Sequence, residues 1–158
     1  MSIEEELKGR FRNEYHRGLI NLNYTTKQLS YEFFQSLKKH GLTEQQYNVL
    51  RILRGFRAET ALSIGFIKER MLDKDSDVSR IVDRLFDKGY LSRRENPGDR
   101  RQKSLEITEK GLTLLDNMFD CEKKADTLLK NLSEAEILEF NRLLDKIRNN
   151  DKNISEKI

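Results

Sequence analysis

Five basic side chains gather around the only proline of the chain, within residues 93–103. Apolar and polar residues alternate with a period of two on both sides of Asn96-Pro97-Gly98-Asp99. Such alternation around a turn sequence predicts a β-hairpin over residues 92–107. Residues 93–103 also contain two acidic residues. This stretch therefore carries a net charge of +3, the same as the whole chain. Guanidinium and ammonium groups concentrated in one hairpin are suited to binding phosphate oxygens.

An amphipathic helix is predicted immediately before this hairpin, over residues 76–88, with Gly89 as the residue that ends it. Its apolar residues form one stripe, and its opposite face carries hydroxyl, carboxylate and guanidinium groups. A helix followed by a basic hairpin is typical of a winged helix-turn-helix, which predicts double-stranded DNA as the partner. The predicted DNA contacts are Ser76, Asp77, Ser79, Arg80 and Arg84 on the helix, and Arg93, Arg94, Arg100, Arg101 and Lys103 on the hairpin.

Helices are predicted over most of the remaining chain. Capping boxes mark helix starts at Ser2, Thr43 and Ser133, and Thr108 is a further N-cap. Apolar residues at spacings of three or four indicate where each helix runs, with a looser stretch at residues 21–26. The predicted helices span residues 3–22, 29–39, 43–56, 63–71, 108–129 and 133–147. The predicted fold class is therefore mainly α with a small β-hairpin wing.

The domain organisation follows from the length of the chain and from the outer helices. A chain of 158 residues is most simply one domain. Residues 42–111 match a winged helix-turn-helix lobe, and the helices of residues 1–41 and 112–150 have more apolar face than this lobe can cover. These outer helices are predicted to form the dimerisation interface of a homodimer. The polar residues 151–158 are predicted to be a frayed tail.

Several classes of protein are not supported by the sequence. No apolar run approaches the roughly 18 residues that span a bilayer, and the acidic N-terminus does not resemble a signal peptide. The one cysteine, Cys121, is expected to be an inert thiol in a reducing compartment, so a cytoplasmic location is predicted. His16 and His40 are isolated from other metal-ligating residues. The sequence therefore predicts no metal site, no cofactor, no membrane partner and no enzyme activity.

Four segments, in this order and at these spacings, resemble the MarR family of bacterial transcription regulators. Residues 42–50 resemble the entry helix of that family, and residues 77–91 resemble its recognition helix and the exit into its wing. Asp99-Arg100-Arg101 resembles the wing motif, and residues 105–111 resemble the closing strand and the start of the next helix. The match is close over residues 42–111, and the flanking helices match by layout only.

The resemblance implies a single MarR-like domain over residues 1–158 that forms an obligate homodimer on a pseudo-palindromic operator. Its members are most often repressors that respond to a ligand or a protein signal. The recognition helices would enter successive major grooves and the wings the adjacent minor grooves. By position, Arg101 is the candidate for minor-groove insertion and Asp99 for holding its guanidinium group, with Arg100 and Lys103 on phosphates.

The resemblance also implies a small-molecule partner. Many relatives bind aromatic anions between the dimerisation helices and the DNA-binding lobe. The candidate ligand residues here are Phe11, Tyr15, Tyr24 and Phe33, which core packing explains equally well.

Two features depart from the common pattern of the family. The connection over residues 57–62 is longer than usual, and the recognition helix has an acidic start. Asp75 is a candidate N-cap, whereas phosphates would repel Asp77 unless it accepts a hydrogen bond from a cytosine amino group. This acidity leaves open an alternative function, a winged-helix protein-interaction module that does not bind DNA.

Overall fold

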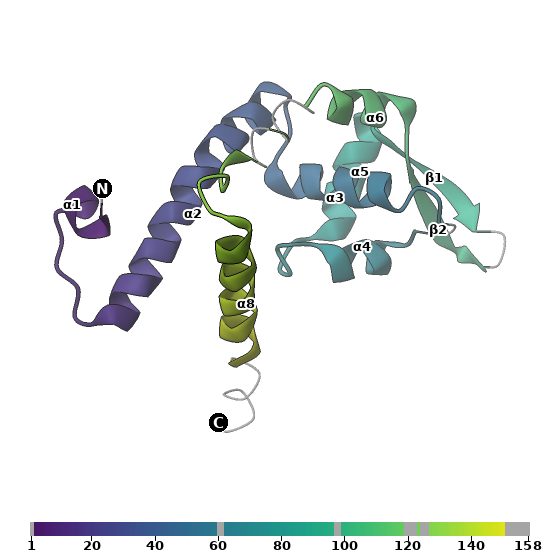
Figure 1. The fold of residues 1–158 in the computed structure, drawn as a ribbon. Coiled ribbons are helices and arrows are strands. Elements are labelled where there is room, and N and C mark those ends of the chain that lie inside the picture. The colour runs from purple at the N-terminus through teal and green to yellow at the C-terminus, as the bar shows by residue number, and fades with distance from the viewer. Residues whose placement is uncertain (1, 60–61, 97–98, 119–122, 124–126, 151–158) are drawn as a thin grey trace. The chain divides into compact units, whose positions relative to one another are not determined.

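The structure is a computed structural model that describes residues 2–59, 62–96, 99–118, 123 and 127–150. The chain divides into two compact units, Met1–Glu122 and Lys123–Ile158. The first unit contains the helices α1 (Ile3–Leu7), α2 (Glu14–Lys39), α3 (Glu44–Gly55), α4 (Ile64–Arg70), α5 (Val78–Asp87) and α6 (Glu109–Asp116), and the strands β1 (Leu91–Asn96) and β2 (Asp99–Ile107). The second unit contains α8 (Glu134–Asn150). Figure 1 shows these elements along the chain.

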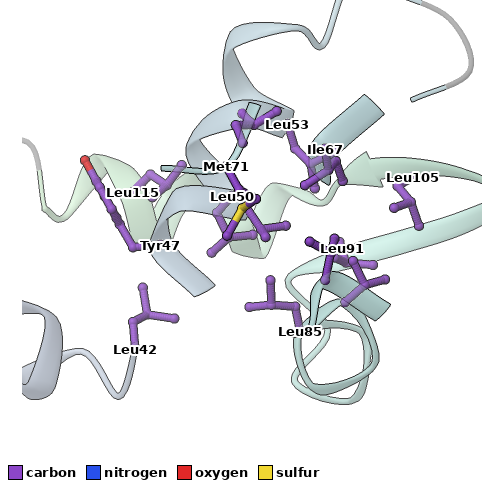
Figure 2. Close-up of a cluster of buried hydrophobic side chains, with 14 of the residues drawn as sticks. Leu42, Tyr47, Leu50, Leu53, Ile67, Met71, Leu85, Leu91, Leu105 and Leu115 are labelled. Carbon is purple, nitrogen blue, oxygen red and sulfur yellow. The ribbon is translucent and has the colours of Figure 1, made fainter. Parts of the chain in front are cut away.

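The core of the first unit is built around α3. Val49, Leu50 and Leu53 of this helix are completely buried, and α3 contacts α2, α4, α5, α6 and β2. Figure 2 shows the leucine-rich cluster in which side chains from these elements meet. Removing so much apolar surface from water is the main stabilising term for a lobe of this size.

The predicted hairpin is confirmed. β1 and β2 pair as an antiparallel two-stranded sheet, with Leu91 opposite Ile107 and Arg93 opposite Leu105. The backbone amide of Leu105 also donates a 2.8 Å hydrogen bond to the carbonyl oxygen of Leu62. The segment that precedes α4 therefore lies against β2, which fixes the hairpin to the helical core.

The predicted helix starts are confirmed where side-chain caps mark them. Ser2 and Thr43 form complete capping boxes, the Thr108 hydroxyl accepts from the Gly111 amide, and the Ser133 hydroxyl accepts from the Glu136 amide. Gly89 has a φ of 73° after the end of α5, as expected for a residue that ends a helix in the left-handed region.

The predicted boundaries within residues 3–39 are wrong at two places. The helix that was expected to run from residue 3 to 22 ends at Leu7, because Lys8 adopts a left-handed conformation and Asn13 caps a new helix at Glu14. The expected loose stretch at residues 21–26 is helical. There, Asn23 and Thr26 donate to the carbonyl oxygens of Leu19 and Leu22, so their polar groups are satisfied within the helix.

At the other end, α6 stops at Asp116, whereas the sequence predicts a helix to about residue 129. A turn follows at residues 117–118, residues 123 and 127 are again helical, and a further turn spans residues 128–131. Residues 119–122 and 124–126 of the predicted helix, including Cys121, and the predicted tail over residues 151–158 lie outside the described residues.

Gly111 provides a test of the packing between α6 and the base of the hairpin, where Tyr90 precedes β1 and Ile107 ends β2. A Cβ atom at this position would lie 2.3 Å from the carbonyl oxygen of Tyr90 and 2.8 Å from Cγ1 of Ile107. We expect Gly111→Ala to lower the free energy of unfolding by about 1–3 kcal/mol, because the backbone must shift. The matched control is Gly55→Ala, where nothing lies within 4 Å of the new Cβ and stability should be unchanged or higher. Urea unfolding of both variants checks this, and equal stabilities would contradict the close contact.

Candidate nucleic-acid interface

The helix α5 presents one buried and one exposed face. Val78, Val82 and Leu85 are buried against the core, whereas Ser79, Arg80 and Arg84 are exposed. The predicted recognition helix over residues 76–88 is therefore confirmed in place but is shorter, because it begins at Val78. The N-cap is Asp77, whose carboxylate accepts a 3.1 Å hydrogen bond from the Arg80 amide. The expectation that Asp75 is the N-cap is wrong.

The turn between α4 and α5 is held by its own acidic residues. The Asp73 carboxylate accepts hydrogen bonds from the Asp75 amide at 3.1 Å and from the Ser76 hydroxyl at 3.0 Å. These bonds hold the pKa of Asp73 below its ordinary value, the Asp75 amide having the largest effect. The buried Asn48 side chain of α3 accepts from the Leu72 amide at 3.0 Å. The acidic residues Asp73 and Asp77 therefore act within the protein, as a turn brace and a helix cap.

An ion pair joins the recognition helix to the wing. The Arg93 guanidinium of β1 donates to the Asp83 carboxylate of α5 and lies 4.9 Å from the centre of the Phe86 ring. Arg93 keeps only 27% of its side-chain exposure, whereas Asp83 keeps 61%. The neighbouring Arg94 is more exposed and pairs with Glu106 on β2 at 3.0 Å. The structure thus gives Arg93 a partner on α5 that the sequence did not predict.

The tip of the wing contains a break in strand register. Glu95 faces Lys103, but the next residue, Asn96, faces Asp99. Residues 100–102 of β2 therefore lie between two consecutive pairs of the ladder and form an enlarged β-bulge, since a common bulge has one extra residue. The predicted contacts Asp99, Arg100, Arg101 and Lys103 all have their backbone on β2 at or beside this bulge. Their side chains, and residues 97–98, lie outside what the structure describes.

The C-terminal end of α5 is bonded to two other helices. The Lys88 ammonium donates to the carbonyl oxygen of Gly41, after α2, at 2.7 Å. The carbonyl oxygen of Lys88 accepts from the Lys110 ammonium at 2.8 Å, and that of Gly89 accepts from the Thr108 hydroxyl at 2.7 Å. These contacts satisfy carbonyl groups that the end of a helix leaves free, and they connect α5 to α2 and α6. Sequence reasoning missed them because the partners are 19 to 47 residues apart.

The structure does not bring the four candidate ligand residues together. Phe33 packs edge-on against Tyr47 of the core with ring centres 5.0 Å apart, and Phe11 contacts His16 at 5.8 Å. Tyr15 keeps 91% of its exposure. The Tyr24 hydroxyl donates to the Glu6 carboxylate at 2.6 Å, which raises the pKa of Tyr24.

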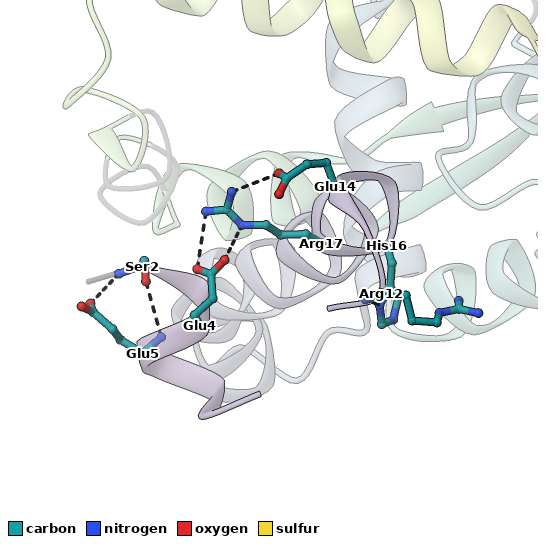
Figure 3. A network of polar contacts seen from close by, with 7 residues as sticks. All are labelled: Ser2, Glu4, Glu5, Arg12, Glu14, His16 and Arg17. Carbon is teal, nitrogen blue, oxygen red and sulfur yellow. Dashed lines mark hydrogen bonds and ion pairs between the residues drawn. The ribbon is translucent and has the colours of Figure 1, made fainter. Parts of the chain in front are cut away.

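A polar cavity of about 520 Å³ lies between α1 and α2, lined by Ser2, Ile3, Glu6, Arg17, Asn21, Tyr24, Thr25 and Gln28. Of the four candidates, Tyr24 alone appears in its lining. On the adjoining surface, the Arg17 guanidinium pairs with Glu4 at 2.6 Å and Glu14 at 3.1 Å, as Figure 3 shows. The pair with Glu4 holds α1 against the start of α2, whereas the pair with Glu14 lies within the first turn of α2.

Two further findings concern other classes of site. Within the described ranges, no helix is long and apolar enough to cross a membrane. In the same part of the chain, no three His, Cys, Asp or Glu side chains are grouped so that they could hold a metal ion.

Comparison with known proteins gives consistent matches. The model of the MarR family matches residues 40–102. The HTH-type transcriptional regulator MhqR of Bacillus subtilis is 31% identical over 122 residues, which cover 77% of this chain and 82% of MhqR. Two crystal structures share the fold. A MepR–DNA complex from S. aureus has a TM-score of 0.72 and 19% identity, covering 82% of this chain and 92% of that chain. A MarR/EmrR family transcriptional regulator from Acinetobacter sp. ADP1 has a TM-score of 0.69 and 24% identity, covering 89% and 99%.

The ion pair between Asp83 and Arg93 can be tested by a double-mutant cycle. Asp83→Asn and Arg93→Gln should each lower the free energy of unfolding slightly, and the pair should show a coupling of about 0.2–1 kcal/mol, as expected for partly exposed partners. Arg94→Gln serves as the control, because Arg94 pairs with Glu106 and should not couple to Asp83→Asn. Chemical unfolding of the single and double variants gives the coupling. A coupling of zero would contradict a stabilising ion pair between Asp83 and Arg93.

Proposed function

The chain belongs to the MarR family of transcription regulators, and on that premise we propose that it binds an operator in double-stranded DNA as a homodimeric, signal-responsive repressor. The recognition helix α5 enters the major groove, and the wing formed by β1 and β2 follows the adjacent minor groove. The single observation that carries this proposal is the ion pair between Asp83 and Arg93. It joins the exposed face of α5 to the basic hairpin, so both can meet the same stretch of duplex.

The acidic start of the recognition helix is compatible with DNA binding once its contacts are considered. It motivated the alternative of a protein-interaction module, because carboxylates repel phosphates. Asp73 and Asp77 are bonded to amide and hydroxyl groups of the turn and the helix start. Their acidity therefore has a structural explanation and does not require an acidic binding surface.

The wing is proposed to supply most of the attraction for the DNA backbone. Arg101 inserts into the minor groove, and Asp99 orients its guanidinium group. Arg94, Arg100 and Lys103 contact phosphates. Arg93 contributes by fixing the wing to α5, in addition to any phosphate that its remaining N–H groups reach.

A second copy of the chain is proposed to cover the outer helices. Large apolar side chains are exposed along both of them: Tyr15, Leu19, Leu22, Tyr31 and Phe34 on α2, and Leu138, Leu143 and Ile147 on α8. Exposed apolar faces of this extent mark interaction surfaces. A homodimer with two-fold symmetry would bury them and would place two recognition helices on one operator.

A signal is proposed to act through the connection between α2 and α5. The Lys88 ammonium bonds to the carbonyl oxygen of Gly41 at the end of α2. A small aromatic ligand or a protein that moves α2 would in this way change the spacing of the two recognition helices and with it the operator affinity.

Salt dependence tests whether DNA is the partner. The affinity of the protein for duplex should fall steeply as salt rises, because each phosphate contact releases a counterion. Arg101→Ala should weaken binding to the operator by about 1–3 kcal/mol. Fluorescence anisotropy with a duplex selected from genomic DNA measures both effects. Absence of binding even at low salt would favour the protein-interaction module, and unchanged affinity in Arg101→Ala would remove Arg101 from the minor groove.

The homodimer can be tested on α8. Leu138→Glu should convert a dimer into a monomer, because it places a charge on a side chain that is 64% exposed in the single chain and buried in the proposed interface. The matched control is Asn141→Glu, which adds a charge at an exposed polar position of the same helix. Sedimentation velocity distinguishes the two forms. A wild-type monomer, or equal dissociation by both variants, would contradict this interface.

A further inference from the structure

We infer that Arg80 reads a guanine in each half-site of the operator, and that it is the main base-reading residue of α5. This inference rests on the proposed function, because it requires α5 to lie in the major groove. There, guanine presents the N7 and O6 acceptors, which one guanidinium group can bind together.

Most polar side chains at the start of α5 are already bonded within the protein. The Ser76 hydroxyl donates to Asp73, and the Asp77 carboxylate accepts from the Arg80 amide. Further along the helix, Asp83 holds Arg93 of the wing. A base contact by any of these groups would have to replace an existing bond that positions the turn, the helix or the wing.

Two guanidinium groups of α5 remain available. Arg80 and Arg84 are exposed, and no side chain in the described part of the structure bonds to either guanidinium group. Arg80 is the third residue of α5 and lies in its first turn, whereas Arg84 lies in its last turn. Recognition helices contact base edges with their N-terminal residues, so Arg80 is placed for the bases and Arg84 for the backbone. The remaining exposed neighbour is Ser79. Its short hydroxyl group can donate or accept a hydrogen bond, so it discriminates poorly between bases.

The local charge supports a reading role over general phosphate binding. Residues 71–89 contain four basic and five acidic residues, whereas residues 93–103 contain five basic and two acidic residues. A surface with a slight negative balance attracts the DNA backbone weakly. The wing therefore supplies affinity for any duplex, and a guanidinium group at the start of α5 contributes chiefly where a suitable base edge accepts it.

The experiment combines a variant of the protein with an altered base. Duplexes that the full-length wild-type protein binds are selected from genomic DNA. Each guanine of the enriched half-site is then replaced in turn, in both half-sites, by 7-deazaguanine, which lacks the N7 acceptor. Replacement by inosine is the matched control, because inosine retains N7 and O6. Binding is measured for the wild type, for Arg80→Ala and for the matched variant Arg84→Ala. Thermal unfolding shows that each variant is folded.

We expect one guanine per half-site at which 7-deazaguanine weakens wild-type binding by about 5-fold or more. At that position inosine should have no such effect. Arg80→Ala should bind the unmodified operator about 5- to 100-fold more weakly than the wild type does. This variant should bind the 7-deazaguanine duplex as well as it binds the unmodified operator. Arg84→Ala should weaken binding to all duplexes alike, lower the salt dependence and keep the full sensitivity to 7-deazaguanine.

Three results would overturn the inference. A selected operator without a guanine sensitive to 7-deazaguanine would exclude this readout. Sensitivity that persists in Arg80→Ala, or that disappears in Arg84→Ala, would assign the contact to another residue. All three leave the proposed DNA-binding function intact. Failure of the wild type to enrich any duplex would instead overturn the proposed function and this inference together.

Discussion

The lobe depends on the burial of α3. Val49, Leu50 and Leu53 have no exposed surface, and the helices and the hairpin of the proposed DNA interface are positioned by packing against this helix. Besides its apolar side chains, α3 supplies Asn48, which is buried and bonded to the turn before the recognition helix. One helix thus provides both the apolar surface that stabilises the lobe and a polar contact that fixes where α5 begins. Because a buried amide without a partner is costly, the position of this turn is coupled to the integrity of the core.

The positions of the charged residues reflect contacts within the protein as well as the proposed DNA partner. The acidic residues before α5 carry charges that disfavour a phosphate backbone, and two of them have a structural role, because they accept hydrogen bonds from amides and a hydroxyl of the turn and the helix start. Within α5, Asp83 is balanced by Arg93 from the wing. The net positive charge of the chain is consequently concentrated in the hairpin. In the proposed complex, this arrangement separates long-range attraction by the wing from recognition of bases by groups on α5.

Much of the fold could be predicted from the sequence because local rules govern it. Side-chain caps at Thr43 and Thr108 mark helix starts through contacts within three residues, and alternation on both sides of a turn predicts the hairpin. The prediction was wrong where a short-range interaction opposed the apolar spacing. That spacing continues past Leu7, but the left-handed conformation of Lys8 and the cap at Asn13 divide the helix.

The candidate site was predictable in its outline and not in its pairings. The spacing of residues on α5 indicates which side chains are exposed, and the structure agrees for Ser79, Arg80 and Arg84. The pairing of Arg93 with Asp83 depends on how a strand crosses a helix, which no local pattern encodes.

The bulge of β2 has a consequence for how such regulators diversify. The ladder from Leu91–Ile107 to Glu95–Lys103 is complete before the bulge begins, so residues 96–102 can be exchanged or lengthened without shifting the paired part of the wing. A change of sequence at the wing tip can therefore leave the helical scaffold and the paired part of the hairpin unaltered, and the tip is a natural junction for building chimeric regulators.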